Sequence, residues 1–317
     1  MKSRLSGRYL ALAILGVVAG GGLIYQAAGE YRDQRRFPMR GSLIAAGMNR
    51  LHLDCSGQGK PAVILEGPQT GLSVLWRPVQ AAVSRFTQVC SYDRAGFGWS
   101  EPGPLPRTSE RIAVELHALL AQARVLPPYV MVGASAGGFH SRVFAARFPA
   151  EVAGVVLVDS SHPDQAKRVH APTNPAGHVE KWEPLLPLMH RFGILRIGLS
   201  QEPRPGSFSQ DAWDEVLFLR DTTNSYRAVL REGEAWAESA EQVRKSGLAA
   251  TPLLVLTGSR DADAEWRALW IDGLQADLAH LSSKGRQIIL PHSGHGIFFD
   301  APAAVVDAIR EMCKAPN

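Results

Sequence analysis

Residues 129–139 read Tyr-Val-Met-Val-Gly-Ala-Ser-Ala-Gly-Gly-Phe. The apolar run at 130–132 predicts a short buried strand and a helical pattern begins at Ala136, so the chain must turn sharply at Ser135. Small residues on both sides of Ser135 allow strained backbone angles and lift its hydroxyl clear of the sheet, which is the mechanical basis of a G-x-S-x-G nucleophile elbow. A Gly-rich turn with an ordinary serine has the same five-residue pattern, so the rest of the chain must decide between the two.

Strands and helices alternate on both sides of this turn. Residues 42–55 predict a hairpin, with Gly47-Met48-Asn49 as its turn. The further strands are expected at 62–66, 88–92, 129–132, 152–158, 252–257 and 286–290, and the helices at 74–86, 109–124, 136–148, 264–281 and 302–312. This alternation requires crossover connections, so it predicts an α/β fold with a mostly parallel, eight-stranded sheet covered by helices on both faces.

The alternation is interrupted between the sixth and the seventh strand. Residues 161–250 contain recurring prolines and helical stretches near 211–219 and 223–238, and they include no clear strand pattern. We therefore expect a helical cap, or lid, inserted at 161–250. The core would then comprise 41–160 and 251–317, after an N-terminal segment at 1–40.

Charge is unevenly distributed along the chain. The 317 residues carry 34 Lys or Arg and 30 Asp or Glu, a formal net charge of +4. Seven of these bases and two of the acids lie in residues 1–40, which leaves 27 bases and 28 acids in the rest. The body is close to neutral, so the sequence predicts no nucleic-acid partner. Its 45% hydrophobic and 20% charged residues are typical of a globular protein rather than of a disordered or multi-span chain.

The N-terminal segment has the pattern of a signal anchor. Lys2, Arg4 and Arg8 precede an uncharged apolar stretch that starts at Tyr9, and charge returns at Glu30. Its four glycines weaken a helix in water but are tolerated in membrane helices. The small residues before Glu30 match a cleavage site poorly, so we expect an uncleaved membrane anchor, with a cleaved signal peptide and secretion as the alternative. In either case the body would lie outside the cytoplasm, in the periplasm or the extracellular space.

The three cysteines are Cys55, Cys90 and Cys313. They form no C-x-x-C pair and have no histidine at metal-ligand spacing, so no metal site is predicted. Cys55 and Cys90 lie on two expected strands that could be neighbours, and an exported domain could join them by a disulfide. Two buried free thiols are the favoured interpretation, because free cysteine is commonly buried.

Candidate catalytic side chains follow three of the expected strands. Ser135 follows the strand that ends at Val132, Asp261 lies just past the seventh strand, and His295 lies just past the last one. In open α/β sheets, functional residues gather at the carboxyl ends of the strands. Serine, aspartate and histidine in this order indicate a hydrolytic triad.

Longer motifs accompany these residues. They are Tyr-Asp-Arg-Ala-Gly-Phe-Gly-Trp-Ser at 92–100, Val-Asp-Ser-Ser-His-Pro at 158–163 and Ser-Gly-His at 293–295. Together with the elbow they resemble the α/β-hydrolase superfamily, and particularly its bacterial membrane-anchored or exported branch. The resemblance extends from Gly41 to Met312 and implies the α/β-hydrolase fold.

The resemblance also implies roles for individual residues. Ser135 would be the nucleophile and His295 the general base that later protonates the leaving group. His292 is a rival base, but the Ser-Gly-His match favours His295.

The acid of the triad is open between carboxylates. Asp261 matches the family's G-x-x-D pattern after the seventh strand and is the first choice. Asp159, at the end of the sixth strand, is the alternative, and Asp263 is a third candidate. The acid would orient His295 and stabilise its protonated form.

The expected oxyanion loop departs from the family pattern. Related enzymes have His-Gly or a Gly-rich loop after the third strand, whereas this chain has Glu66-Gly67-Pro68-Gln69. Proline has no N–H, so Pro68 cannot donate a hydrogen bond. If the loop keeps the family register, the donors are the backbone N–H groups of Gln69 and Ala136.

The sequence therefore predicts a serine hydrolase that cleaves an ester or related acyl bond of a small molecule through an acyl-enzyme, without a cofactor. One alternative is a binding or scaffold protein that keeps the fold without activity, which the unusual loop motivates. Another is perhydrolysis or acyl transfer on the same triad.

Overall fold

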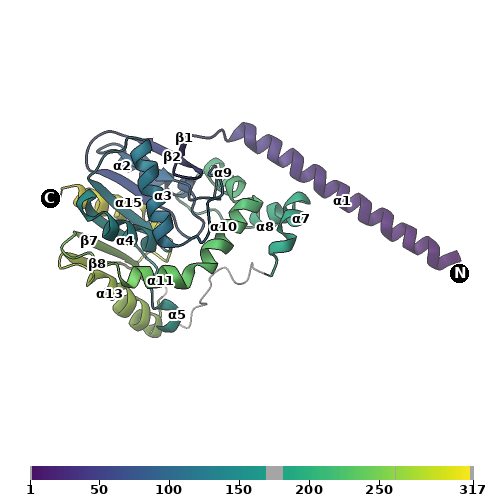
Figure 1. The fold of residues 1–317 in the computed structure, drawn as a ribbon. Coiled ribbons are helices and arrows are strands. Elements are labelled where there is room, and N and C mark those ends of the chain that lie inside the picture. The colour runs from purple at the N-terminus through teal and green to yellow at the C-terminus, as the bar shows by residue number, and fades with distance from the viewer. Residues whose placement is uncertain (1, 169–180, 261, 315–317) are drawn as a thin grey trace.

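The computed structural model describes residues 2–168, 181–260 and 262–314. An eight-stranded sheet lies at the centre, in the order β1-β2-β4-β3-β5-β6-β7-β8 (Figure 1). Its strands are β1 (Ser42–Ala45), β2 (Arg50–Ser56), β3 (Ala62–Glu66), β4 (Val89–Tyr92), β5 (Tyr129–Ala134), β6 (Val152–Val158), β7 (Leu253–Gly258) and β8 (Gly285–Leu290). The β1–β2 hairpin is antiparallel and β2 pairs antiparallel with β4, whereas every other neighbouring pair is parallel. The predicted α/β-hydrolase architecture is confirmed.

Helices cover both faces of the sheet because successive strand residues point to opposite sides. In β5, Met131 packs into the core beneath α3 (Ser109–Gln122) and α4 (Gly137–Arg147), and Val130 and Val132 pack into the core on the other face. That second core lies beneath α2 (Arg77–Val83) and α15 (Pro302–Lys314). A strand buried on both faces reads as a continuous apolar run, as Val130–Val132 does.

Several expected helices are divided in the structure. The region 74–86 begins as a 3₁₀ turn, η1 (Ser73–Trp76), before α2, and a 3₁₀ turn, η2 (Pro149–Glu151), precedes β6. The region 264–281 consists of α12 (Ala264–Trp266), the π-helical segment η4 (Arg267–Gln275) and α13 (Ala276–Ala279). A short helix, α14 (Ile297–Asp300), precedes α15.

The described part of the inserted segment 161–250, here called the cap, consists of helices joined by loops and contains no strand. It contains α5 (Gln165–Arg168), η3 (Glu183–Leu185), α7 (Leu186–Arg191), α8 (Ile194–Leu199), α9 (Gln210–Arg220), α10 (Thr223–Glu234) and α11 (Trp236–Arg244). The helix expected at 223–238 is thus two helices. Trp236 stacks on Phe139 of α4 with ring centroids 4.9 Å apart, and Arg77 of α2 forms an ion pair with Glu215 of α9. These contacts seat the cap on the core.

The N-terminal segment forms one long helix, α1 (Lys2–Arg36). Its N-terminal half projects away from the body, and its C-terminal half lies along α7, α8 and α9 of the cap (Figure 1). By length and composition, residues 12–36 include one segment apolar enough to cross a membrane, and 11% of its most apolar window is buried. The helix continues to Arg36, so most of the expected linker is helical.

Cys55 of β2 and Cys90 of β4 form a disulfide. The two residues are directly opposite each other in the antiparallel β2–β4 pair. The favoured interpretation of two free thiols is therefore wrong, because the topology places β4 beside the hairpin rather than beyond β3. Cys313 is a partly buried free thiol.

Candidate active site

Ser135 lies at the tip of the turn between β5 and α4. Its φ angle is +50°, a left-handed conformation that is costly for a residue with a side chain and that exposes the hydroxyl above the sheet. The neighbouring glycines permit this turn. A Cβ at Gly137 would lie 2.4 Å from the carbonyl oxygen of Gly67, and one at Gly138 would lie 1.8 Å from Ser160 Oγ. The sequence at 133–138 is therefore required by close backbone packing as well as by the turn.

His295 follows β8 and points its imidazole at the serine. Its Nε2 lies 3.1 Å from Ser135 Oγ, and its Nδ1 lies 2.6 Å from Asp159 Oδ2. The hydrogen bond to Asp159 raises the pKa of His295 above its ordinary value, and partial burial opposes this shift. The side chain of His295 is 62% exposed, so a substrate can reach it from solvent.

Asp159 ends β6 in a left-handed conformation, with a φ angle of +40°. Its carboxylate is buried, and Oδ1 accepts hydrogen bonds from the backbone N–H of Gly258 at 3.2 Å and from Trp270 Nε1 at 3.3 Å. Oδ2 is left for His295. One oxygen is thus held by fixed donors while the other orients the imidazole.

The structure places the alternative acid, Asp159, against His295. Asp261 lies outside the described residues, and the single proton on His295 Nδ1 is already directed at Asp159. Asp263 is the N-cap of α12, where its Oδ1 accepts a hydrogen bond from the N–H of Trp266 at 2.8 Å. We therefore replace Asp261 with Asp159 as the proposed acid. The rival base, His292, is exposed and is not the histidine that contacts Ser135.

Trp270 also contacts Asp159, and no motif in the sequence indicates this contact. It lies on η4 and is nearly buried, stacked against Trp266 with centroids 5.3 Å apart. A π-helical segment within a longer helix often marks a functional site, and here it aims an indole N–H at the carboxylate. The apolar pattern of 264–281 predicts a helix but contains no signal for its register against Asp159.

The loop after β3 lies directly beside the elbow. Gly71 N–H donates to Pro68 O at 2.9 Å, which closes a tight turn around Gln69. The close approach of Gly137 to Gly67 brings this turn against the N-terminus of α4, which Ala136 precedes. The loop that carries Gln69 therefore lies beside Ala136 and the elbow.

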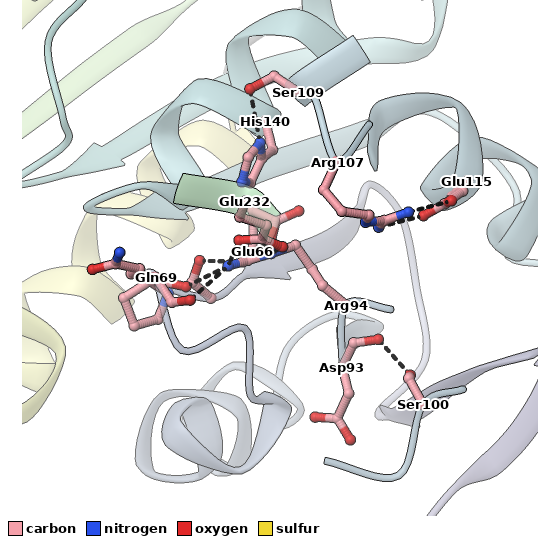
Figure 2. Close-up of polar contacts among 12 residues, drawn as sticks. Glu66, Gln69, Asp93, Arg94, Ser100, Arg107, Ser109, Glu115, His140 and Glu232 are labelled. Carbon is pink, nitrogen blue, oxygen red and sulfur yellow. Dashed lines mark hydrogen bonds and ion pairs between the residues drawn. The ribbon is translucent and has the colours of Figure 1, made fainter. Parts of the chain in front are cut away.

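Arg94 supports the loop after β3 through hydrogen bonds to its carbonyl groups (Figure 2). It donates from Nη1 to the carbonyl of Gly67 at 2.8 Å and from Nη2 to that of Pro68 at 2.7 Å. The loop therefore has a rigid support although it lacks the family's glycines.

The same guanidinium binds two buried carboxylates, Glu66 on β3 and Glu232 on α10 (Figure 2). Burial raises the pKa of Glu66 to about 7, against the opposing effect of Arg94. Glu66 also accepts a hydrogen bond from the hydroxyl of Tyr92. This cluster joins the cap to the loop and to the sheet.

Other histidines of the core have structural contacts. His52 lies 2.9 Å from Asp93, and His140 Nδ1 lies 3.0 Å from Ser109 Oγ. Burial, with Arg94 and Arg107 nearby, holds the pKa of His140 well below its ordinary value, so this imidazole is neutral. Among the described residues, no group of three or more His, Cys, Asp or Glu side chains is arranged to hold a metal ion.

Curated proteins similar to this chain include several without an established function. An uncharacterized Schizosaccharomyces pombe protein is 33% identical over 139 residues, which cover 35% of this chain and 26% of its own length. Bacillus subtilis YqjL, also uncharacterized, is 25% identical over 265 residues, 82% of this chain and 86% of YqjL. The (lyso)-N-acylphosphatidylethanolamine lipase of Mus musculus is 23% identical over 288 residues, 80% of this chain and 79% of the lipase. The chain thus spans about a quarter of the S. pombe relative and most of the other two.

Solved structures share the fold. The Cif epoxide hydrolase of Acinetobacter nosocomialis superposes with a TM-score of 0.71 at 15% identity, covering 92% of this chain and 96% of the hydrolase. A thermophilic esterase of Thermogutta terrifontis superposes with a TM-score of 0.61 at 22% identity, covering 86% and 97%. The sequence model of the alpha/beta hydrolase family matches residues 67–308, which include Ser135, Asp159 and His295. The chain belongs to the alpha/beta hydrolase family.

Proposed function

We propose that the protein is a serine hydrolase that cleaves an ester or related acyl bond, attached to a membrane by α1 with its catalytic body outside the cytoplasm. The observation that carries this proposal is the continuous chain of contacts from Ser135 Oγ through His295 to the buried carboxylate of Asp159. A serine hydroxyl is a poor nucleophile at neutral pH, and an imidazole within hydrogen-bond reach activates it.

In the proposed reaction, Ser135 Oγ attacks the acyl carbon while His295 Nε2 takes the hydroxyl proton. The N–H groups of Gln69 and Ala136 would stabilise the negative charge that develops on the carbonyl oxygen. Collapse of the resulting tetrahedral intermediate breaks the bond to the leaving group. The leaving group receives the proton from His295, and the acyl group remains on Ser135 as an acyl-serine. A water molecule, deprotonated by His295, then attacks the acyl-serine, releases the carboxylic acid and restores the Ser135 hydroxyl.

Asp159 would act through His295. It holds the proton on Nδ1, so that Nε2 is free to accept, and it stabilises the imidazolium formed in each half of the reaction. Gly258 and Trp270 fix the carboxylate, which lets it orient the imidazole without moving.

An acyl substrate is supported by the residue at the elbow and by the relatives. A serine forms an acyl-enzyme, whereas epoxide hydrolases and dehalogenases of this fold place a carboxylate at the elbow. The chain is similar over most of its length to a lipase acting on an N-acylated phospholipid and has the fold of an esterase. These similarities support hydrolysis of an ester more than cleavage of an amide, although the triad itself would serve either bond.

The scaffold hypothesis rested on Pro68 in the oxyanion loop. Arg94 holds the carbonyls of this loop and the triad is within hydrogen-bond distance throughout, so the described part of the site does not favour an inactive protein. Perhydrolysis would use the same residues, and it is distinguished by product formation that depends on peroxide.

Turnover of p-nitrophenyl esters with acyl chains of increasing length tests the proposal. We expect a burst of p-nitrophenol equal to the enzyme concentration, followed by a slower steady state, if deacylation limits turnover. Ser135→Ala should abolish both phases, whereas Ser283→Ala should keep them, because Ser283 is exposed in the turn before β8, at the opposite end of that strand from His295. Equal turnover by Ser135→Ala would overturn the assignment.

A further inference from the structure

The turn between α7 and α8 is packed against the apolar part of α1. A Cβ at Gly22 would lie 2.7 Å from the carbonyl oxygen of Phe192, and one at Gly193 would lie 2.7 Å from the ring of Tyr25. Gly193 has a φ of +72°, as this tight turn requires. The cap therefore contacts α1 within the uncharged stretch and not only after it.

The depth of this contact follows from helix geometry. Residues 9–29 carry no charge, and 21 helical residues extend about 31 Å, close to the thickness of the hydrocarbon layer of a bilayer. Gly22 is seven residues before the end of this stretch, or about 10 Å along the axis. If α1 crosses the membrane, Gly22 and the turn that touches it lie within the depth occupied by interfacial helices.

Ion pairs also hold the cap against α1. Just past the uncharged stretch, Asp33 accepts from Arg196 of α8 at 2.6 Å, and Arg36 pairs with Asp211 and Asp214 of α9 at 2.7 and 2.8 Å. The Asp33–Arg196 pair is mostly shielded from water, so solvent screens it less than an exposed pair. The α7–α8 pair is thus attached to α1 at two levels.

The surface that α7 and α8 leave exposed has the composition of a membrane-binding face. One side of the pair packs inward, where Leu186 and Leu195 meet Leu230 of α10. The exposed residues between 181 and 198 are Lys181, Trp182, Pro184, Leu185, Pro187, Leu188, Arg191, Ile194, Ile197 and Gly198. This set contains two bases and no acid, and Leu188, Ile194 and Ile197 are each 52–53% exposed. Large apolar side chains exposed together in this way are typical of a protein or membrane interaction site.

We propose that this face, residues 181–198, lies in the interface of the bilayer that α1 crosses, with Lys181 and Arg191 against anionic lipid headgroups. The inference rests on the proposed anchor and goes beyond it: the cap itself binds lipid. Leu230 joins this face to α10, and α10 carries Glu232, which binds Arg94 behind the oxyanion loop. The arrangement suits an amphiphilic acyl substrate that resides in the same membrane.

Depth measurements on the full chain test the lipid contact. In a Cys313→Ser background, nitroxide labels are placed at Leu188→Cys or Ile194→Cys in nanodiscs that contain anionic lipid, with Val17→Cys of α1 and Met48→Cys of the hairpin as references. Val17 and Met48 are both highly exposed in the structure, so neither label disturbs packing. We expect labels at 188 and 194 to be more accessible to oxygen than to a water-soluble nickel chelate, as at Val17, and the opposite at Met48.

The two reference labels distinguish a failure of the lipid-binding face from a failure of the membrane anchor. Labels at 188 and 194 that behave like Met48 while Val17 is in lipid would overturn the lipid-binding face and leave the anchor intact. A label at Val17 that also behaves like Met48 would overturn the anchor, and the lipid-binding face with it.

Kinetics give a second test. The double variant Leu188→Ser/Ile194→Ser should raise KM about tenfold for an ester embedded in anionic vesicles and leave turnover of a short soluble ester unchanged. Leu126→Ser is the matched control. Leu126 is 60% exposed and lies just before the amino end of β5, whereas the catalytic residues follow the carboxyl ends of the strands. Equal KM values for the double variant and Leu126→Ser on vesicles would contradict the proposal.

Discussion

Arg94 and Glu232 form a buried bidentate ion pair, with Nε to Oε1 and Nη2 to Oε2 both at 2.8 Å. Glu232 belongs to the cap, whereas Arg94 also holds the carbonyls of the loop after β3. Replacing Glu232 by Gln should loosen this loop and lower kcat about tenfold, a fraction of the roughly 100- to 1000-fold loss that follows from removing one oxyanion donor. KM for a short ester should change little, because the pair does not contact the open side of the site.

A matched pair serves as the control for this prediction. Arg107 and Glu115 form a similar buried bidentate pair, with both contacts at 2.7 Å, away from the loop (Figure 2). Glu115→Gln should destabilise the fold to a similar degree, measured by urea unfolding, and leave kcat unchanged. If both variants lower kcat equally, the loss reflects general destabilisation and not support of the loop.

Removing the carboxylate of Asp159 should have the larger effect. Asp159→Asn leaves the shape of the side chain but no longer fixes the proton on His295 Nδ1, and kcat should fall about 10⁴-fold. The carboxylate raises the pKa of His295, and the base acts only when it is neutral. Activity of the wild type should therefore decline as pH falls through this raised pKa, and the acid limb of Asp159→Asn should lie at lower pH.

Asp263→Asn is the control for this pH profile. Asp263 caps α12, and asparagine is an equally good N-cap, so this variant should keep both its stability and its pH–rate profile close to the wild type. A profile that shifts in Asp263→Asn and stays unchanged in Asp159→Asn would contradict the assignment of the acid.

The elbow glycines provide a test of backbone packing. A Cβ at Gly137 would lie 2.4 and 2.6 Å from the carbonyl oxygens of Gly67 and Glu66, so Gly137→Ala must displace the loop or the helix. We expect acylation to slow about 100-fold or more, measured as the amplitude and rate of the burst. Gly247→Ala, where no atom lies within 4 Å of the added methyl, should react like the wild type.

The disulfide predicts a redox-dependent stability. Cys55–Cys90 closes a loop with a sequence separation of 35, for which chain-entropy arguments give about 4 kcal/mol of stabilisation. Denatured protein should show one reactive thiol, that of Cys313, and all three cysteines should react after reduction. Three reactive thiols without reductant would show that the bridge does not form.

The sequence was sufficient for the sheet because each buried strand is marked by its own apolar run. It was also sufficient to single out Ser135 and His295, whose side chains lie within hydrogen-bond distance of each other in the structure. The acid was different, because Asp159 and Asp261 both follow a strand and no local pattern indicates that the carboxylate of Asp159 lies against His295 Nδ1. Asp159 was recognisable only as an alternative.

Long-range pairing explains the other differences. The Cys55–Cys90 bridge depends on the position of β4 next to the hairpin, and the Arg94–Glu232 pair joins residues 138 positions apart. Neither leaves a periodic signal in the sequence. The docking of α1 on the cap depends likewise on ion pairs such as Asp33–Arg196, whose partners no local pattern connects.

The most direct test of the central claim is covalent labelling of Ser135. A fluorophosphonate should add one label per folded chain, on the peptide that contains residues 129–139, and mass spectrometry should place the label on Ser135. Ser135→Ala should remain unlabelled, and Asp159→Asn should label far more slowly than the wild type. Equal labelling of wild type and Ser135→Ala, or a label on another residue, would contradict the account.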